Sequence, residues 1–189
     1  MTRALWRVVG IAAVTLLLAA CASGPVRIPR GAALDNGFEL NGRFAVRYGE
    51  EAASGRLQWR HTKGEDDLTI ASPLGQGLVS LVRRDSLFTL KTSDERTLTA
   101  PDAEDLTEQT LGWRLPVSGL PAWLRGRPAA GSEARYERDG QGKLLALMQD
   151  GWRVEYLDYF DGNELPSRLR LRSEGIEIRL VIDEWRATR

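Results

Sequence analysis

The chain has 189 residues, with 26 basic and 26 acidic side chains and a single cysteine and histidine. This length suffices for one domain with a substantial core, and the balanced charge argues against a nucleic-acid-binding protein. One cysteine and one histidine exclude a disulfide framework and a zinc site of the usual histidine–cysteine kind.

Residues 1–20 have the features of an export signal. Arg3 and Arg7 precede an uncharged apolar run, Val8 to Ala20, that is too short for a spanning helix with polar flanks. The run ends in Leu-Ala-Ala-Cys, which resembles the lipobox of bacterial lipoproteins. The resemblance implies cleavage before Cys21 and acylation of its sulfur and new amino group. Several acyl chains would hold the protein firmly, because each buried methylene is worth about 0.8 kcal/mol.

The residues after Cys21 predict an anchored protein with a flexible tether. Ala22 stands where an aspartate retains many such proteins in the inner membrane, which implies export to the outer membrane, facing the periplasm. Residues 21–37 are rich in glycine and proline without a period, and at ~3.5 Å per residue they could span roughly 50 Å. The folded domain is expected over residues 38–189.

From Phe38 onward, apolar and polar residues alternate with the period of two that is typical of strands. In GRFAVRY, for example, Phe44, Val46 and Tyr48 share one face. One apolar and one polar face per strand indicates an antiparallel sheet solvated on one side. Later in the chain, Asp150-Gly151 predicts a two-residue primed turn between two strands.

Two short helices interrupt the strands. Asp102 can cap a helix over AEDLTEQTL that ends at Gly112, and Ser118 can cap a shorter helix that ends at Gly126. Nine to eleven strands with two or three helices predict a mainly β (α+β) fold. A sheet of this size with one apolar face must curl or be covered. We therefore predict a strongly curved antiparallel sheet that forms an incomplete barrel, with the helices lying across its open side. Alternation alone does not separate an apolar cavity from a packed core.

Motifs for catalysis are missing from the sequence. His61 would be the only histidine base, and no G-x-S-x-G or phosphate-binding G-x-x-x-x-G-K-[ST] motif occurs. The acidic runs at residues 65–67 and 102–105 fit a turn and a helix start better than a metal site. We therefore expect no enzyme, cofactor or metal.

One loop between two expected strands has an unusual tip. Pro73, Gly75 and Gly77 are ordinary turn residues, but Leu74 stands where a hairpin normally meets water. Leu74 either folds back to cap the core or is an apolar probe offered to a bilayer or a partner. Burial of one leucine is worth about 1.5–3 kcal/mol, enough to bias the contacts of a tethered protein.

Motifs spread in order along the chain resemble the outer-membrane lipoprotein receptor LolB family. They are the lipobox, Leu40-Asn41-Gly42-Arg43-Phe44, Trp59, Ser72-Pro73-Leu74-Gly75, Leu111-Gly112 through Pro116, Leu120 to Gly126, Gly151-Trp152, Leu165-Pro166 and Trp185. The similarity covers essentially the whole mature domain, and its strength lies in the order and spacing of the motifs.

The resemblance implies a concave sheet with helices over an apolar cavity. It also implies a function: accepting acylated lipoproteins from the periplasmic carrier LolA and inserting them into the outer membrane. The resemblance implies that the leucine of the Pro-Leu-Gly loop, here Leu74, is functional. This favours the interpretation of Leu74 as an apolar probe. Candidates for the cavity wall, each of which could equally be packed core, are Phe44, Val46, Trp59, Leu68, Ile70, Phe88 and Leu90, with Leu120 and Trp123 on the covering helix.

Other functions stay open at the level of sequence. The chain could be an anchored lipid or glycolipid carrier, or a structural lipoprotein of an assembly complex with a packed core. The expected partners are a LolA-like carrier, acylated cargo and outer-membrane lipid, with no nucleic acid, and the protein is expected to be a monomer.

Overall fold

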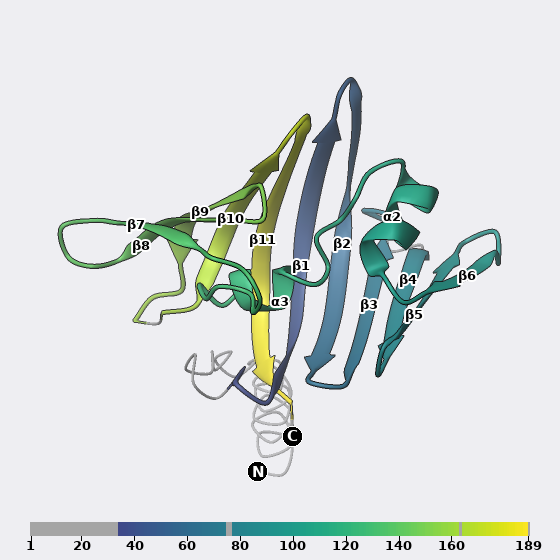
Figure 1. Ribbon diagram of the computed structural model, residues 1–189, viewed down its shortest axis with the longest axis horizontal. Coiled ribbons are helices and arrows are strands. Elements are labelled where there is room, and N and C mark those ends of the chain that lie inside the picture. Colours follow the sequence, from purple (N-terminus) through teal and green to yellow (C-terminus); the bar gives the residue numbers. More distant parts are fainter. Residues whose placement is uncertain (1–33, 75–76, 163, 189) are drawn as a thin grey trace, which may run out of the picture.

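The computed structural model describes residues 34–74, 77–162 and 164–188. Cys21, the export signal, Gly75 and residues 21–33 of the tether lie outside them. Eleven strands form one antiparallel sheet in the order β6-β5-β4-β3-β2-β1-β11-β10-β9-β8-β7 (Figure 1). The strands are β1 (Gly37–Tyr48), β2 (Glu51–Thr62), β3 (Glu65–Ala71), β4 (Gly77–Arg84), β5 (Leu87–Thr92), β6 (Thr97–Ala100), β7 (Arg135–Arg138), β8 (Leu144–Gln149), β9 (Trp152–Tyr159), β10 (Pro166–Ser173) and β11 (Ile176–Ala187).

Two helices, α2 (Ala103–Leu111) and α3 (Leu120–Trp123), connect β6 to β7. Figure 1 shows both on the same face of the sheet, α2 over the β3–β5 side and α3 over β1 and β11. Among the described residues, no helix is long and apolar enough to cross a membrane.

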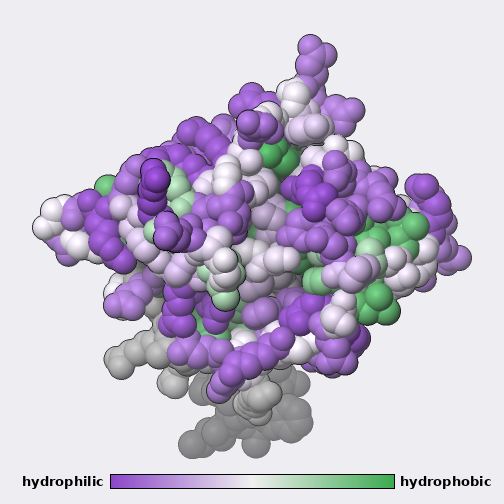
Figure 2. All heavy atoms as spheres, viewed as in Figure 1, coloured by the Kyte–Doolittle hydropathy of each residue, from purple (hydrophilic) through white to green (hydrophobic). Residues whose placement is uncertain are grey.

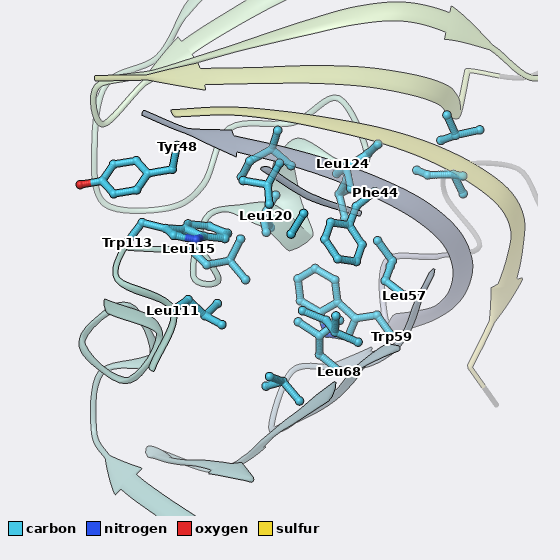
Figure 3. A pocket seen from close by; sticks show the side chains of 18 of the residues that line it. Phe44, Tyr48, Leu57, Trp59, Leu68, Leu111, Trp113, Leu115, Leu120 and Leu124 are labelled. Carbon is cyan, nitrogen blue, oxygen red and sulfur yellow. The ribbon is translucent and has the colours of Figure 1, made fainter. Parts of the chain in front are cut away.

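The mainly β class, the antiparallel pairing and the number of strands are confirmed. The sheet is open: β6 and β7 are its two edges, and neither is paired with the other in the described part of the chain. Figure 3 shows β1 and β11 bending as they pass the pocket described below. The sheet is therefore bent but not closed, and its apolar face depends on the α2–α3 segment for cover.

Three strands of twelve residues, β1, β2 and β11, form the centre of the sheet. β1 pairs along nearly its whole length with both neighbours, and a bulge after Asn41 shifts its register with β11. Gly42 follows this bulge, and a Cβ there would lie 2.6 Å from the Val181 carbonyl oxygen. Such close backbone approach needs glycine. Glycine at this position thus allows β1 and β11 to approach closely beside the bulge.

The structure confirms the predicted turn at Asp150-Gly151 and the predicted ends of the first helix. Asp150 and Gly151 have φ values of 52° and 77°, as a primed two-residue hairpin turn requires. At α2, the Asp102 carboxylate accepts a hydrogen bond from the Asp105 N–H at 3.0 Å, and Gly112 ends the helix with φ 79°.

The predicted cap of the second helix was wrong. α3 spans only four residues, its N-cap is Gly119, and no side chain caps it. The Ser118 N–H and hydroxyl instead donate to the Glu104 carboxylate at 3.0 and 3.2 Å. Ser118 therefore ties the α3 segment to the first turn of α2.

Residues just before the predicted domain start at residue 38 contact the folded domain. Leu34 is fully buried, and its carbonyl accepts a 2.9 Å hydrogen bond from Arg125 Nη1. Arg127 pairs with Asp35, and the Arg125 guanidinium lies 5.7 Å from the centre of the Phe38 ring. Residues 34–37 are therefore fixed to the segment that follows α3.

We expect Trp185→Ala to cost about 3–5 kcal/mol of unfolding free energy. Trp185 has no exposed surface, packs edge-to-face on Phe38 with ring centres 5.1 Å apart, and donates its indole N–H to the Pro166 carbonyl. Urea unfolding measures the change. Leu157→Ala, at a side chain that is 46% exposed, is the control and should change stability by less than about 0.5 kcal/mol. Equal losses in both variants would contradict this packing.

Candidate functional site

A cavity of about 250 Å³ lies between the apolar face of the sheet and the α2–α3 segment. Figure 3 shows Tyr48, Leu111 and Trp113 toward one end and Phe44, Leu57, Trp59 and Leu68 toward the other. Its lining comes from the sheet and from its cover: Leu40, Phe44, Val46, Tyr48, Glu51, Ala52, Ala53, Leu57, Trp59, Leu68, Ile70, Val79, Ile178, Leu180, Val181 and Ile182, with Leu111, Trp113, Leu115, Leu120 and Leu124.

The structure brings six of the predicted wall residues together around this cavity: Phe44, Val46, Trp59, Leu68, Ile70 and Leu120. Phe88 and Leu90 are buried in β5 but do not line it. Trp123 is also buried outside it, and its indole N–H donates to Gln149 Oε1 at 2.8 Å. These three residues belong to the packed core: Leu90 and Trp123 are at most 1% exposed, and Phe88 is 9% exposed.

Gly55 creates the space that Phe44 occupies. The two residues are partners in the β1–β2 register, and a Cβ on Gly55 would lie 2.9 Å from Phe44 Cε1. It would also lie 2.2 Å from the Ala71 carbonyl oxygen. The missing side chain therefore lets an aromatic ring lie across the neighbouring strand at the pocket wall.

The lining residues outside the predicted set are Leu40, Tyr48, Leu57 and Val79 on β1, β2 and β4, the residues of the β1–β2 hairpin end, and two further groups. Leu111, Trp113, Leu115 and Leu124 come from the irregular segment around the helices, where no periodicity indicates which side chains face inward. Ile178, Leu180 and Ile182 come from β11, where the strict alternation did assign them to the apolar face. For β11, the sequence did not show that this strand lies beside β1 and therefore borders the pocket.

The chemistry of the lining suits an apolar ligand. Glu51 is the only acidic or basic side chain among the lining residues. Its side chain is exposed beside Ala52 and Ala53 at the β1–β2 hairpin end. No group of three or more metal-binding side chains occurs in the described part of the chain. A cavity of about 150 Å³ lined by apolar side chains holds a benzene molecule. About 250 Å³ therefore accepts roughly ten carbon atoms of an acyl chain.

A buried polar cluster lies behind one wall of the pocket. Asp66 is only 4% exposed, and its carboxylate accepts the Trp59 indole N–H at 2.9 Å and contacts His61 Nδ1 at 2.7 Å. Its second oxygen accepts Arg83 Nε at 2.5 Å. Arg83 also donates to the carbonyls of Lys63, Asp85 and Thr62 in the neighbouring turns.

This cluster changes the interpretation of two sequence features. His61 is a largely buried strand-end residue and not a free surface side chain. Asp66 belongs to the inner face of β3 and not to a solvated turn. Burial by itself raises the pKa of Asp66, but the hydrogen bonds from His61, Arg83 and Trp59 outweigh it and hold that pKa below its ordinary value.

The Leu74 side chain is 91% exposed at the tip between β3 and β4. Pro73, before it, is exposed as well. The structure thus excludes the interpretation that Leu74 folds back to cap the core. Most of the surface in Figure 2 is hydrophilic, with small hydrophobic areas such as the one on the β5–β6 side. Among the exposed large apolar side chains of the described residues, Leu74 stands out, because the next most exposed, Leu87, is 51% exposed.

Comparison with known proteins gives the family. The family model "Outer membrane lipoprotein LolB" matches residues 36–185, nearly all of the described domain. The chain belongs to the LolB family of outer-membrane lipoproteins. This membership confirms the resemblance seen in the sequence, and it groups the chain with lipoproteins of the outer membrane that are not enzymes.

Two relatives illustrate the extent of the match. The outer-membrane lipoprotein LolB of Pseudomonas fluorescens (strain Pf0-1) is 38% identical over 152 residues, 79% of this chain and 74% of the relative. LolB of Stutzerimonas stutzeri (strain A1501) is 37% identical over 187 residues, 90% of each chain. Among solved structures, a LolA superfamily protein from Nitrosomonas europaea is similar in fold, with a TM-score of 0.53, 8% identity and coverage of 86% of this chain and 95% of that one.

The Asp66 cluster predicts an acid-sensitive contribution to stability in this LolB-family chain. The pKa of Asp66 is lower in the folded protein than its ordinary value of 3.8, so the unfolded chain takes up its proton first as the pH falls. The stabilisation is therefore complete above about pH 5 and is lost as the pH falls below 4. We expect Asp66→Asn to cost about 3 kcal/mol at pH 7, since it leaves the largely buried Arg83 guanidinium without its carboxylate, and clearly less at pH 3.

Urea unfolding of both proteins between pH 7 and pH 3 measures this difference. Asp67→Asn makes the same charge change at the next residue of β3, on the solvated face, and should have a small effect at every pH. A loss from Asp66→Asn that stayed constant down to pH 3 would contradict the role assigned to the carboxylate.

Proposed function

We propose that this protein receives acylated lipoproteins from a LolA-like periplasmic carrier in the apolar pocket and transfers them to the outer membrane. The observation that carries the proposal is the pocket itself: a bent sheet with one apolar face, incompletely filled by its cover, in a chain of the LolB family. Cys21, acylated after cleavage of the signal, anchors the protein at the site of delivery.

The pocket volume limits what it holds in this conformation. Space for roughly ten carbons accepts a segment of one acyl chain and not the three chains of a mature lipoprotein. Further chains require the α2–α3 segment to move away from the sheet. α3 has only four residues and no side-chain cap. Its movement away from the sheet would break the hydrogen bonds that Trp123 makes with Gln149 and Tyr156, whereas the segment between α2 and α3 can move without breaking them.

The cost of exposing acyl chains to water determines how the cargo is transferred. At about 0.8 kcal/mol per methylene, release of a lipoprotein into water costs tens of kcal/mol. The cargo therefore passes directly from the carrier's binding site to this pocket and then to the bilayer. With no nucleotide-binding motif in the sequence, each step runs downhill in free energy.

Leu74, with Pro73 and Gly75 around it, serves as the membrane-contacting loop. Its side chain is already in water, so insertion into a bilayer removes apolar surface without disturbing the core. The gain of about 1.5–3 kcal/mol is too small to anchor the protein but large enough to favour one orientation of a tethered domain. The loop thus presents the pocket to the membrane in a defined way.

We expect Leu74→Glu to leave folding and cargo acceptance unchanged and to reduce insertion of cargo into liposomes at least tenfold, since a charged tip opposes entry into the bilayer. The assay measures transfer of acylated cargo from the carrier through the lipidated protein into liposomes. Leu157→Glu, at another exposed leucine, is the matched control and should transfer cargo normally. Normal insertion by Leu74→Glu would remove the loop from the mechanism.

A second substitution tests the pocket without touching the core. Ala53 is exposed and lines the pocket at the hairpin end, whereas Ala45 is exposed on the opposite face of the neighbouring strand. We expect Ala53→Trp to fill the entrance and lower cargo acceptance from the carrier about tenfold, and Ala45→Trp to have no effect. Cargo acceptance is read by co-purification in the absence of liposomes. Equal acceptance by both variants would count against the pocket as the binding site.

A further inference from the structure

Trp59 lines the pocket and carries an indole N–H that needs a hydrogen-bond acceptor. Its ring lines the cavity, and Figure 3 shows it with Phe44, Leu57 and Leu68 at one end. A buried indole N–H needs an acceptor, which gives the ring one preferred orientation when that acceptor is fixed. Here the acceptor is Asp66 Oδ1, at 2.9 Å.

Asp66 does not line the pocket, but its own position is strongly fixed. In the register of the sheet, Asp66 lies directly between His61 on β2 and Arg83 on β4. Both side chains are hydrogen-bonded to it and both are only 16% exposed. Hydrogen bonds to a charged acceptor are roughly twice as strong as neutral ones. A carboxylate held from both sides therefore gives Trp59 a rigid acceptor.

The aromatic neighbours of Trp59 do not fix the ring by themselves. Phe38 and His61 both lie edge-to-face with it, with ring centres 5.8 and 6.3 Å away, and neither contact has the directionality of a hydrogen bond. On the pocket side, the ring borders the cavity, although only 3% of its surface is exposed. Loss of the hydrogen bond removes the one directional contact of the indole and lets the ring shift toward the cavity, into volume that an acyl chain needs.

We propose that Asp66 is a positioning residue for acyl binding: through the Trp59 indole it holds one wall of the pocket in place without touching the ligand. This inference rests on the proposed function, since it concerns the same pocket. In this proposal, His61 and Arg83 fix the Asp66 carboxylate. The apolar site therefore depends on a polar cluster behind it.

The test measures acyl binding by photolabelling with a palmitic acid that carries a mid-chain diazirine, using the full-length lipidated protein in nanodiscs. Trypsin releases residues 57–60, which contain Leu57 and Trp59, and residues 115–125, which contain Leu115, Leu120 and Leu124. Residues 154–168 do not contribute to the pocket and report non-specific labelling. The readout is the probe concentration that gives half-maximal labelling of residues 115–125.

We expect Asp66→Asn to raise that concentration about fivefold while maximal labelling stays near that of the wild type. A merely structural role would lower the folded fraction, and with it maximal labelling, without moving the half-saturating concentration. Tyr159→Phe is the matched control, because it removes a 2.6 Å hydrogen bond to the Leu144 carbonyl far from the pocket. It should leave the half-saturating concentration unchanged.

A second replacement covers the case in which Asp66→Asn does not fold. Benzothienylalanine at position 59 keeps the shape of the indole, replaces only its N–H by sulfur, and leaves Asp66 paired with His61 and Arg83. It should raise the half-saturating concentration by the same factor. Wild-type affinity in the replaced protein would overturn the inference, whereas absence of pocket labelling in the wild type itself would overturn the proposed function.

Discussion

An apolar sheet face larger than its cover is the constraint on which this structure depends. Eleven strands place their apolar side chains on one side, and two helices of nine and four residues with their connecting segment lie over them. Where α2 packs, over β5 and β6, Leu90 is fully covered and Phe88 nearly so. Over β1, β2, β3 and β11 the cover is thinner, and the space left there is the pocket. The proposed binding of an acyl chain rests on this mismatch in area.

Side chains that border an empty pocket lack packing partners on the side that faces it. The walls are therefore fixed from behind or by the backbone. Gly55 gives the Phe44 ring a place across the next strand, and Asp66 holds the Trp59 indole by a hydrogen bond. Arg125 joins the end of α3 to the entry of β1 through the Leu34 carbonyl. These devices leave apolar surface free for an acyl chain while the domain stays ordered.

The periodicity of the sequence was sufficient for the sheet and insufficient for its cover. Alternation assigned Phe44, Trp59, Leu68 and Ile178 to the apolar face, and local turn chemistry placed Asp150-Gly151 and the ends of α2 correctly. It did not reveal that Trp123 is buried away from the pocket, because which side of a four-residue helix faces the cavity depends on tertiary contacts such as the one to Gln149. Asp66 was assigned to a turn from its charge, although period two places it on the inner face with Leu68 and Ile70. Its burial depends on Arg83, a partner seventeen residues away that local patterns do not predict.

The central claim is that an acyl chain of the cargo occupies the space between β1–β3 and the α2–α3 segment. A crystal structure of the protein bound to an acylated lipoprotein peptide tests it most directly. The account predicts continuous acyl density between Phe44, Trp59 and Leu68 on the sheet and Leu115, Leu120 and Leu124 on the cover, with Trp59 still bonded to Asp66. Acyl density on the solvated face of the sheet, with the pocket collapsed, would contradict it.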